Sequence, residues 1–243
     1  MGRKIIAYGL TDPGLKRTNN EDAFLVREDA GVVAVVDGMG GAAAGEVASA
    51  LAVAAIDEVF DGRPPDSPQA AKELVSEAFG KAHGMILDHV SENPEHKGMG
   101  CTAEVLAFHE DGYLLGHVGD SRTYALRDGE FRQLSKDHSL VQQQVEQGIL
   151  DPGMARNHHM RNVILRAVGV DENLAVDLVT GNAAPGDLFL LCSDGLSDMV
   201  EDDVLDQVLS SPLDLPAKAR RLVELAKEAG GADNITVILA MIP

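Results

Sequence analysis

The feature that most constrains the fold is residues 32–45, which read VVAVVDGMGGAAAG. The first five residues are apolar and mostly β-branched, a pattern that predicts a buried strand. That strand runs directly into Asp37 and Gly38. A buried carboxylate is costly unless a cation neutralises it, and a glycine beside it lets a backbone carbonyl approach the same cation. Taken alone, the stretch fits an ordinary strand-to-helix turn equally well.

The same arrangement occurs three more times along the chain. Four aspartates each adjoin an apolar strand and a glycine or another small residue: Asp37, Asp120, Asp194 and Asp233. Carboxylates that converge at one edge of a sheet repel one another strongly unless cations lie between them. Oxygen ligands without histidine or cysteine favour Mg²⁺ or Mn²⁺, and two such ions can activate a water for attack on a phosphoryl group. The pattern therefore predicts phosphoester hydrolysis, with a plain turn or cap as the alternative, above all at Asp120.

The charge of the chain excludes several other classes of function. Its 243 residues include 20 Lys plus Arg against 39 Asp plus Glu, a formal charge of −19. This balance argues against nucleic acid or an anionic membrane as a partner, because both require basic patches. Cys101 and Cys192 have no metal-type spacing and indicate a reducing compartment. No signal peptide or membrane-spanning run is visible, so we expect a soluble cytoplasmic protein, and a monomer by default.

Hydrophobic periodicity predicts a single α+β domain over residues 1–243. Helical spacing of apolar residues covers residues 45–60, 71–86, 138–148, 201–209 and 216–229. Strands are expected at residues 4–10, 22–27, 32–36, 103–109, 113–118, 121–127, 131–134, 173–179, 187–192 and 235–241. The four strands within residues 103–134 are interpreted as one antiparallel meander, and residues 151–162 as an exposed, mobile excursion. Without repeats or an interdomain linker, helices layered on sheets are the expected packing.

Six motifs resemble, in their order along the chain, those of the metal-dependent protein phosphatase family (type 2C serine/threonine phosphatases) in its compact bacterial form. The matching residues are Arg17 with Asn20-Glu21-Asp22-Ala23, Asp37-Gly38-Met39-Gly40-Gly41 with Gly45-Glu46, Gly100 with Thr102, Gly119-Asp120-Ser121-Arg122, Ser193-Asp194-Gly195-Leu196 and Asp233-Asn234-Ile235-Thr236. Each motif alone is weak. Together they span nearly the whole chain, which makes the match specific.

The resemblance implies a four-layer α/β/β/α sandwich, in which helices flank a central pair of antiparallel sheets. It also implies two Mn²⁺ or Mg²⁺ ions as cofactors. By this analogy Asp37 bridges the two ions, Asp194 and Asp233 complete the first site, and the Gly38 carbonyl contributes to the second. Asp120, together with Asp194, resembles the weaker third-metal site of the bacterial members.

The same analogy assigns roles to the remaining motif residues. Glu21 would hold a metal-bound water, and Arg17 would bind the substrate phosphate through a bidentate fork that lysine cannot copy. Asp22 would orient Arg17 or the metal-bound waters. Residues 138–166 resemble the family's flap, which lies beside the active site and affects substrate access. The alternative for Arg17 is a surface cation beside Lys16, which its position four residues before Glu21 disfavours.

The chain departs from the family at two positions where members carry a histidine. These positions are Met39 and Ala42 here. The acid that protonates the leaving group is therefore open, with a metal-bound water or a flap histidine, His158 or His159, as the alternatives. Both histidines are better explained as solvated loop residues.

Two classes of function compete. The first is a phosphatase for phosphoserine and phosphothreonine in proteins, which works by direct attack of a metal-activated hydroxide and opposes a Ser/Thr protein kinase, in one variant as the antagonist of a single regulatory kinase. The second is a catalytically silent module that binds phosphoproteins. The intact set Asp37, Asp194 and Asp233 favours the enzyme. Ser121 and Ser193 lack a neighbouring base, so we expect them to hydrogen-bond aspartates rather than act as nucleophiles.

Overall fold

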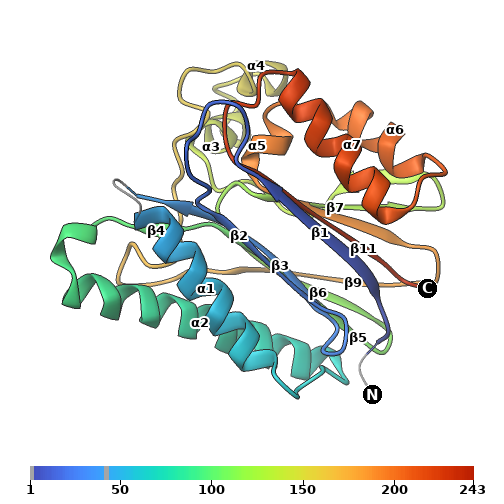
Figure 1. Cartoon of the computed structure of the whole chain (residues 1–243), viewed down its shortest axis with the longest axis horizontal. Helices are drawn as coiled ribbons and strands as arrows, with labels where there is room; N and C mark the ends of the chain where they lie inside the picture. Colours follow the sequence, from blue (N-terminus) through green and yellow to red (C-terminus); the bar gives the residue numbers. More distant parts are fainter. Residues whose placement is uncertain (1–2, 41–43) are drawn as a thin grey trace.

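The structure, a computed structural model, describes residues 3–40 and 44–243. Two antiparallel β-sheets are stacked face to face at its centre, and helices cover the outer face of each sheet (Figure 1). The four-layer α/β/β/α sandwich implied by the resemblance is therefore confirmed.

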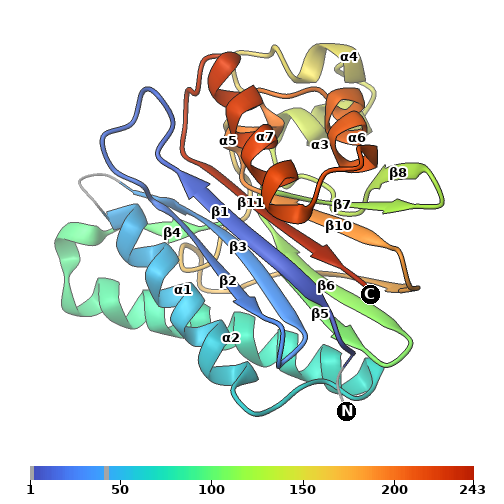
Figure 2. The ribbon, with the colours of Figure 1, turned by 45° about the vertical axis from the view of Figure 1, so that its right-hand side comes forward.

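The first sheet has the strand order β2-β3-β5-β6-β9. Its strands are β2 (Asp22–Arg27), β3 (Val32–Met39), β5 (Ala103–His109), β6 (Gly112–Val118) and β9 (Asp177–Asn182), and the short β4 (Gly100–Cys101) pairs with the end of β3. Its outer face is covered by α1 (Ala44–Phe60) and α2 (Pro68–Glu92), and the 3-10 turn η1 (Pro94–His96) follows α2 (Figure 2).

The second sheet has the strand order β1-β11-β10-β7-β8. Its strands are β1 (Ile6–Asp12), β11 (Ile235–Met241), β10 (Leu188–Cys192), β7 (Arg122–Arg127) and β8 (Glu130–Gln133). Its helices are the one-turn α5 (Asp194–Ser197), α6 (Asp202–Ser210) and α7 (Leu215–Glu228). The short helices α3 (Leu140–Glu146) and α4 (Pro152–Ala155) lie beside α5 at one end of the sandwich (Figure 1).

Local capping explains where the long helices begin. Before α2, the Ser67 side chain accepts a hydrogen bond from the Ala70 N–H at 3.2 Å, and proline follows at the first helical position. Before α7, Asp214 accepts from the Ala217 N–H at 2.8 Å. Both arrangements satisfy N–H groups that a helix start otherwise leaves without partners.

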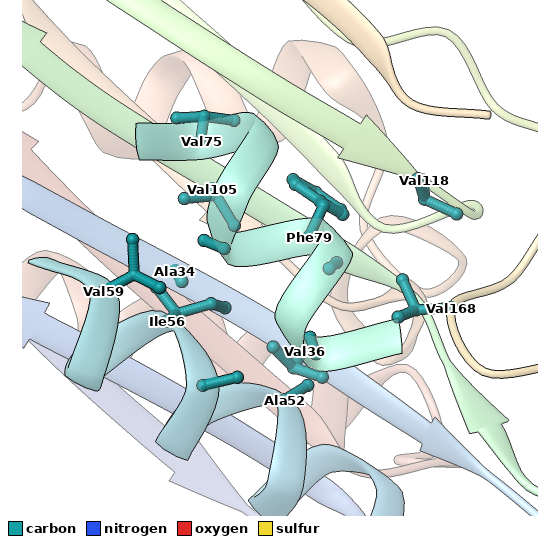
Figure 3. Packing of buried hydrophobic residues seen from close by; sticks show 14 of the residues in the cluster. Ala34, Val36, Ala52, Ile56, Val59, Val75, Phe79, Val105, Val118 and Val168 are labelled. Atoms are coloured by element: carbon teal, nitrogen blue, oxygen red, sulfur yellow. The ribbon is translucent and has the colours of Figure 1, made fainter. Parts of the chain in front are cut away.

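Hydrophobic side chains fill all three spaces between the four layers. Between the first sheet and its helices, Ile56 of α1 and Phe79 of α2 pack towards Val36 and Val105 of the sheet (Figure 3). The space between the sheets holds Val35, Leu106, Phe108, Phe189, Leu191 and Ile238, and the space under α6 and α7 holds Leu190, Leu205, Leu222 and Val237. Strands β3, β5, β10 and β11 are therefore buried on both faces, which explains their unbroken apolar runs.

The prediction of one meander over residues 103–134 is wrong. Strands β5 and β6 pair in the first sheet, whereas β7 pairs with β10 and β8 in the second. The chain changes sheet at Gly119, whose φ of +111° favours glycine, and at Asp120. Two hairpins in one sheet and two hairpins in facing sheets carry the same sequence pattern, so the turn residues alone did not reveal the change. The change places Asp120 where the two sheets meet.

One smaller prediction is wrong in its bounds, whereas the excursion at residues 151–162 is exposed or half-buried, in agreement with the prediction of an exposed segment. The strand expected at residues 173–179 begins four residues later, as β9 (Asp177–Asn182). The excursion at residues 151–162 contains the helical turn α4, which begins at Pro152 after Asp151 accepts from the Gly153 N–H at 2.9 Å. Among the described helices, none has an apolar stretch long enough to cross a lipid bilayer.

A buried ion pair within the first sheet is linked to the second sheet by a threonine hydroxyl. Glu104 of β5 pairs with His117 of β6, and the Thr123 hydroxyl of β7 also donates to Glu104. The two charged side chains are 0% and 1% exposed. Burial lowers the pKa of His117, but Glu104 outweighs that effect and the pKa rises to about 9. The ion pair with Glu104 makes His117 a structural residue.

Candidate active site

The predicted acidic residues come together where strands of both sheets end. Asp22 and Asp37 lie opposite each other in the register of β2 and β3. Asp194 opens α5 directly after β10, and Asp233 lies just before β11. A cavity of about 350 Å³ lies here, and its lining includes six predicted residues: Arg17, Glu21, Asp37, Gly38, Asp194 and Asp233. Each sheet therefore contributes carboxylates to one site.

The carboxylates repel one another and are poorly solvated. Burial raises the pKa of Asp37 well above its ordinary value, and the charges of Asp22, Asp194, Asp120 and Asp233 raise it further. Burial likewise raises the pKa of Asp194 well above the ordinary value. In each of Asp22, Asp120 and Asp194, the Oδ1 atom is buried and has no hydrogen-bond partner among the described residues. Oxygens of this kind suit a cation, because a buried acceptor without a partner is costly.

Asp120 lies on the other side of Asp194 from the first cavity. Asp120 and Asp194 both line a second cavity of about 380 Å³, which extends beneath the residues of α3 and α4. Burial raises the pKa of Asp120 to about 7, and the charges of Asp137 and Asp198 contribute to the rise. The two predicted metal regions, at Asp37 and at Asp120, therefore adjoin each other through Asp194.

The donor set fits hard divalent cations, although one ligand is engaged elsewhere. Carboxylates and a backbone carbonyl without histidine or cysteine select Mg²⁺ or Mn²⁺. Within the described residues, no group of three His, Cys, Asp or Glu side chains is already arranged around one ion position. Both carboxylate oxygens of Asp233 have partners: Oδ2 accepts from Arg17 at 2.7 Å and Oδ1 accepts from the Asn234 N–H at 2.8 Å. Arg17 thus neutralises a carboxylate that the resemblance assigns to a metal.

Two glycines allow the Gly38 carbonyl to lie beside Glu21. A Cβ atom on Gly38 would lie 2.0 Å from the Gly45 carbonyl oxygen and 2.6 Å from that of Glu21, which no side chain can occupy. The Gly38 N–H donates to the Glu21 carbonyl at 3.1 Å. A Cβ on Gly45 would lie 2.9 Å from the Glu21 carboxyl carbon. Glycine at both positions therefore brings a carbonyl and a carboxylate to the same side of the cavity.

Asn234 is a site residue whose role the sequence did not reveal. Its Oδ1 accepts from the Glu21 N–H at 2.8 Å, and its Nδ2 donates to the carbonyls of Pro13 at 3.1 Å and Asn19 at 2.9 Å. The side chain thereby fixes the loop between β1 and β2, which carries Arg17 and Glu21, to the start of β11. Asparagine next to an acidic motif residue reads as an ordinary turn residue, so only the structure shows these long-range contacts.

We expect Asn234→Ala to destabilise the protein by roughly 2–4 kcal/mol, because it removes three hydrogen bonds from a side chain that is 4% exposed. Urea denaturation followed by circular dichroism measures the change, since the chain contains no tryptophan. The exposed Asn173→Ala is the matched control and should leave stability within about 0.5 kcal/mol of the original. Equal stabilities of the two variants would contradict the role assigned to Asn234.

Ser193 holds an aspartate, as expected, whereas Ser121 contacts Thr102 instead of an aspartate. The Ser193 hydroxyl donates to Asp22 Oδ2 at 2.7 Å. The hydroxyls of Ser121 and Thr102 are 2.7 Å apart, and the Thr102 hydroxyl accepts from the Asp37 N–H at 3.2 Å. Two alternative roles were predicted for Asp22, and its action on metal-bound waters stays a prediction. Within the described chain, Arg17 donates to Asp233 rather than to Asp22, which contradicts the other role, the orientation of Arg17. The physical reason is that Asp22 is 8% exposed and points at the Ser193 side of the sheets.

Of the two positions where family members carry a histidine, Met39 and Ala42, the structure describes only the first. Met39 lines the cavity at its glycine-rich side, whereas Ala42 and Gly41 lie outside the described residues. From the flap, the cavity lining among the described residues includes Asn162 and Ile164 and neither His158 nor His159. The rings of these two histidines lie 4.4 Å apart instead, centroid to centroid.

Comparison with known proteins identifies relatives that cover most of the chain. Residues 16–228 match the family model for protein phosphatase 2C. The serine/threonine protein phosphatase PstP of Mycobacterium tuberculosis is 42% identical over 95% of this chain and 43% of its own length. The crystal structure of the serine/threonine phosphatase Stp1 from Staphylococcus aureus has a TM-score of 0.94 at 31% identity, covering 100% of this chain and 97% of that chain.

A second solved structure bears on the metal. The catalytic domain of PstP in complex with two manganese ions has a TM-score of 0.88 at 38% identity, covering 98% of this chain and 97% of that chain. The chain spans less than half the length of the full mycobacterial relative, 43%, while it covers the solved catalytic domain almost completely.

Proposed function

The chain belongs to the protein phosphatase 2C family, and we propose that it hydrolyses phosphoserine and phosphothreonine in proteins with the help of Mn²⁺ or Mg²⁺. The observation that carries this proposal is the set of buried carboxylates with unpartnered oxygens, next to a cavity that Arg17 also lines. Carboxylates that cannot neutralise one another attract divalent cations, and the arginine beside them attracts a phosphate. A phosphomonoester is the substrate class that needs both.

The proposed metal ligands are those of the family resemblance. Asp37 would bridge two ions, with Asp194 and Asp233 at the first and the Gly38 carbonyl at the second. Glu21 would hold a coordinated water. Bound divalent ions would supply a hydroxide nucleophile near neutral pH and neutralise the phosphoryl oxygens. Asp120, with Asp194, would bind a third ion more weakly, in keeping with its place in the neighbouring cavity.

The protein's own side chains would position the substrate. Arg17 is half-exposed and donates to Asp233 through Nη2. We propose that its guanidinium exchanges this carboxylate for the substrate phosphate, which accepts two parallel hydrogen bonds from the fork. The exchange would release Asp233 to the metal. Asp22, held by Ser193, would act on metal-bound waters instead of on Arg17.

We also propose the domain bounds, the physiological substrates, the location and the oligomeric state, from the family resemblance and the charge of the chain. Residues 1–243 would form one phosphatase catalytic domain, with residues 138–166 as its flap. The physiological substrates would be proteins phosphorylated by a Ser/Thr kinase, and that kinase itself, in the cytoplasm. The formal charge of −19 disfavours nucleic acid or an anionic membrane as a partner. We propose a monomer.

The test is hydrolysis of a phosphothreonine peptide by the purified protein, in Mn²⁺ and after treatment with EDTA. We expect phosphate release that requires the ion and returns when Mn²⁺ is added back. Tight binding of the peptide without hydrolysis under all metal conditions would instead support the silent phosphoprotein-binding module.

A further inference from the structure

Two arginines, Arg156 and Arg161, attach the flap, residues 138–166, to α5 and the turn after it. Arg156, the residue after α4, makes three hydrogen bonds to residues 197–201, which include the end of α5 and the turn that follows it. Its Nη2 donates to the carbonyls of Ser197 at 2.6 Å and Val200 at 2.7 Å, and its Nη1 donates to Glu201 Oε2 at 3.0 Å. The Arg156 side chain is only 24% exposed, so these contacts are partly shielded from solvent.

Two of the three acceptors of Arg156 are backbone carbonyls. Ser197 is the last residue of α5, and Val200 lies in the turn that leads to α6. In the part of the chain that the structure describes, no backbone N–H donates to either carbonyl, so the guanidinium supplies their hydrogen bonds. The planar fork of arginine can reach several acceptors at once, whereas a lysine ammonium on its flexible stem cannot reproduce that geometry.

This attachment joins two segments that both contribute residues to the cavity at Asp37, namely α5 and the flap. The first residue of α5 is Asp194, three positions before Ser197. Six residues after Arg156, the flap contributes Asn162 to the cavity at Asp37, and Ile164 follows. A second arginine of the flap, Arg161, donates to Asp198 Oδ2 at 3.0 Å at the end of the same short helix.

We propose that Arg156 is a positioning residue that latches the flap to the end of α5. The latch sets how far the flap residues Asn162 and Ile164 lie from the carboxylate of Asp194. The proposal rests on the phosphatase function proposed above. Loosening the latch would leave the phosphate site intact, because Arg17 and the carboxylates lie on other elements. It would weaken the binding of the polypeptide that flanks the phosphorylated residue, because the flap borders the cavity through Asn162 and Ile164.

The first experiment measures the latch without catalysis. Hydrogen exchange by mass spectrometry compares the full chain with Arg156→Lys and Arg156→Ala, using the exposed Arg220→Lys of α7 as the control. We expect exchange in residues 140–166 to accelerate by about tenfold or more in both Arg156 variants, because charge-assisted hydrogen bonds are lost. Glu201→Gln should have a smaller effect, since it keeps both carbonyl acceptors. Unchanged flap exchange in Arg156→Ala would overturn the latch, whether or not the protein is a phosphatase.

The second experiment measures what the latch does for a substrate. For a phosphothreonine peptide, we expect Arg156→Lys to raise KM by roughly 5–20-fold with kcat within about threefold of the original. For p-nitrophenyl phosphate, which has no polypeptide to contact the flap, KM should change by less than about twofold. Equal losses on both substrates would overturn the positioning role. Failure of the original protein to hydrolyse either substrate would count against the proposed function alone, because the exchange result stands without it.

Discussion

Asp37→Asn is expected to lower metal-dependent hydrolysis of a phosphothreonine peptide by at least about a thousandfold, because it removes the carboxylate proposed to bridge both ions. The same change should leave the metal-free protein as stable as the original or more stable, by about 1 kcal/mol at pH 8. The stabilising effect follows from the charges around Asp37, where burial and four neighbouring aspartates disfavour the ionised form. An amide in its place carries no charge, so it removes this repulsion.

The two effects are measured on the same samples. Phosphate release gives the activity, and thermal unfolding by circular dichroism with EDTA or with Mn²⁺ gives the stability. The exposed Asp66→Asn, in the loop between α1 and α2, is the control and should retain full activity. A loss of activity in Asp37→Asn that is accompanied by a large loss of metal-free stability would mean that the residue is structural, against the role proposed here.

Removal of the metal is expected to reverse the usual dependence of stability on pH. Burial raises the pKa of Asp22 from 3.8 to about 6, and that of Asp120 from 3.8 to about 7. At pH values between the ordinary pKa and the raised pKa of each group, the folded protein binds more protons than the unfolded chain. Its stability therefore falls as pH rises from about 4 to 7. For Asp22 alone the shift corresponds to roughly 3 kcal/mol, at 1.36 kcal/mol per pKa unit. Carboxylates with lowered pKa values, such as Asp187, act below pH 4 and do not oppose this trend.

Urea denaturation in EDTA at pH 4.5, 5.5, 6.5 and 7.5 tests this expectation. Saturating Mn²⁺ should add the most stability at the highest pH, because the ion binds ionised carboxylates in the folded state. Asp22→Asn should flatten the slope in EDTA. A metal-free stability that rises steadily from pH 4.5 to 7.5 would show that the carboxylates are not forced together in the way the structure indicates.

Much of the fold follows from local pattern, whereas the division into two sheets does not. The predicted strands at residues 22–27, 103–109 and 235–241 agree with β2, β5 and β11 in both bounds, because apolar runs between charged turns are unambiguous. The exchange of sheets at Gly119 and Asp120 was missed, since it depends on which partner β7 finds seventy residues later. Pairing between distant strands leaves little trace in a single sequence.

The candidate site shows the same division between local and distant information. Aspartates at strand ends are visible because burial and charge conflict at one position, as at Asp37. Asn234 was not recognised as a clamp, because its three partners lie more than two hundred residues away. The same holds for the pairing of Arg17 with Asp233, which replaces the expected contact between Arg17 and Asp22.

The position of β11 has a consequence for synthesis of the protein on the ribosome. This strand lies between β1 and β10, so β1 has no neighbour in its sheet until residues 235–241 have been made. The first sheet up to β6, with α1 and α2, can form much earlier, because its contacts are closer in sequence. Asp37 is then in place long before Asp233 emerges. We therefore expect the set of carboxylates at the site to stay incomplete in nascent chains until β11 has inserted between β1 and β10.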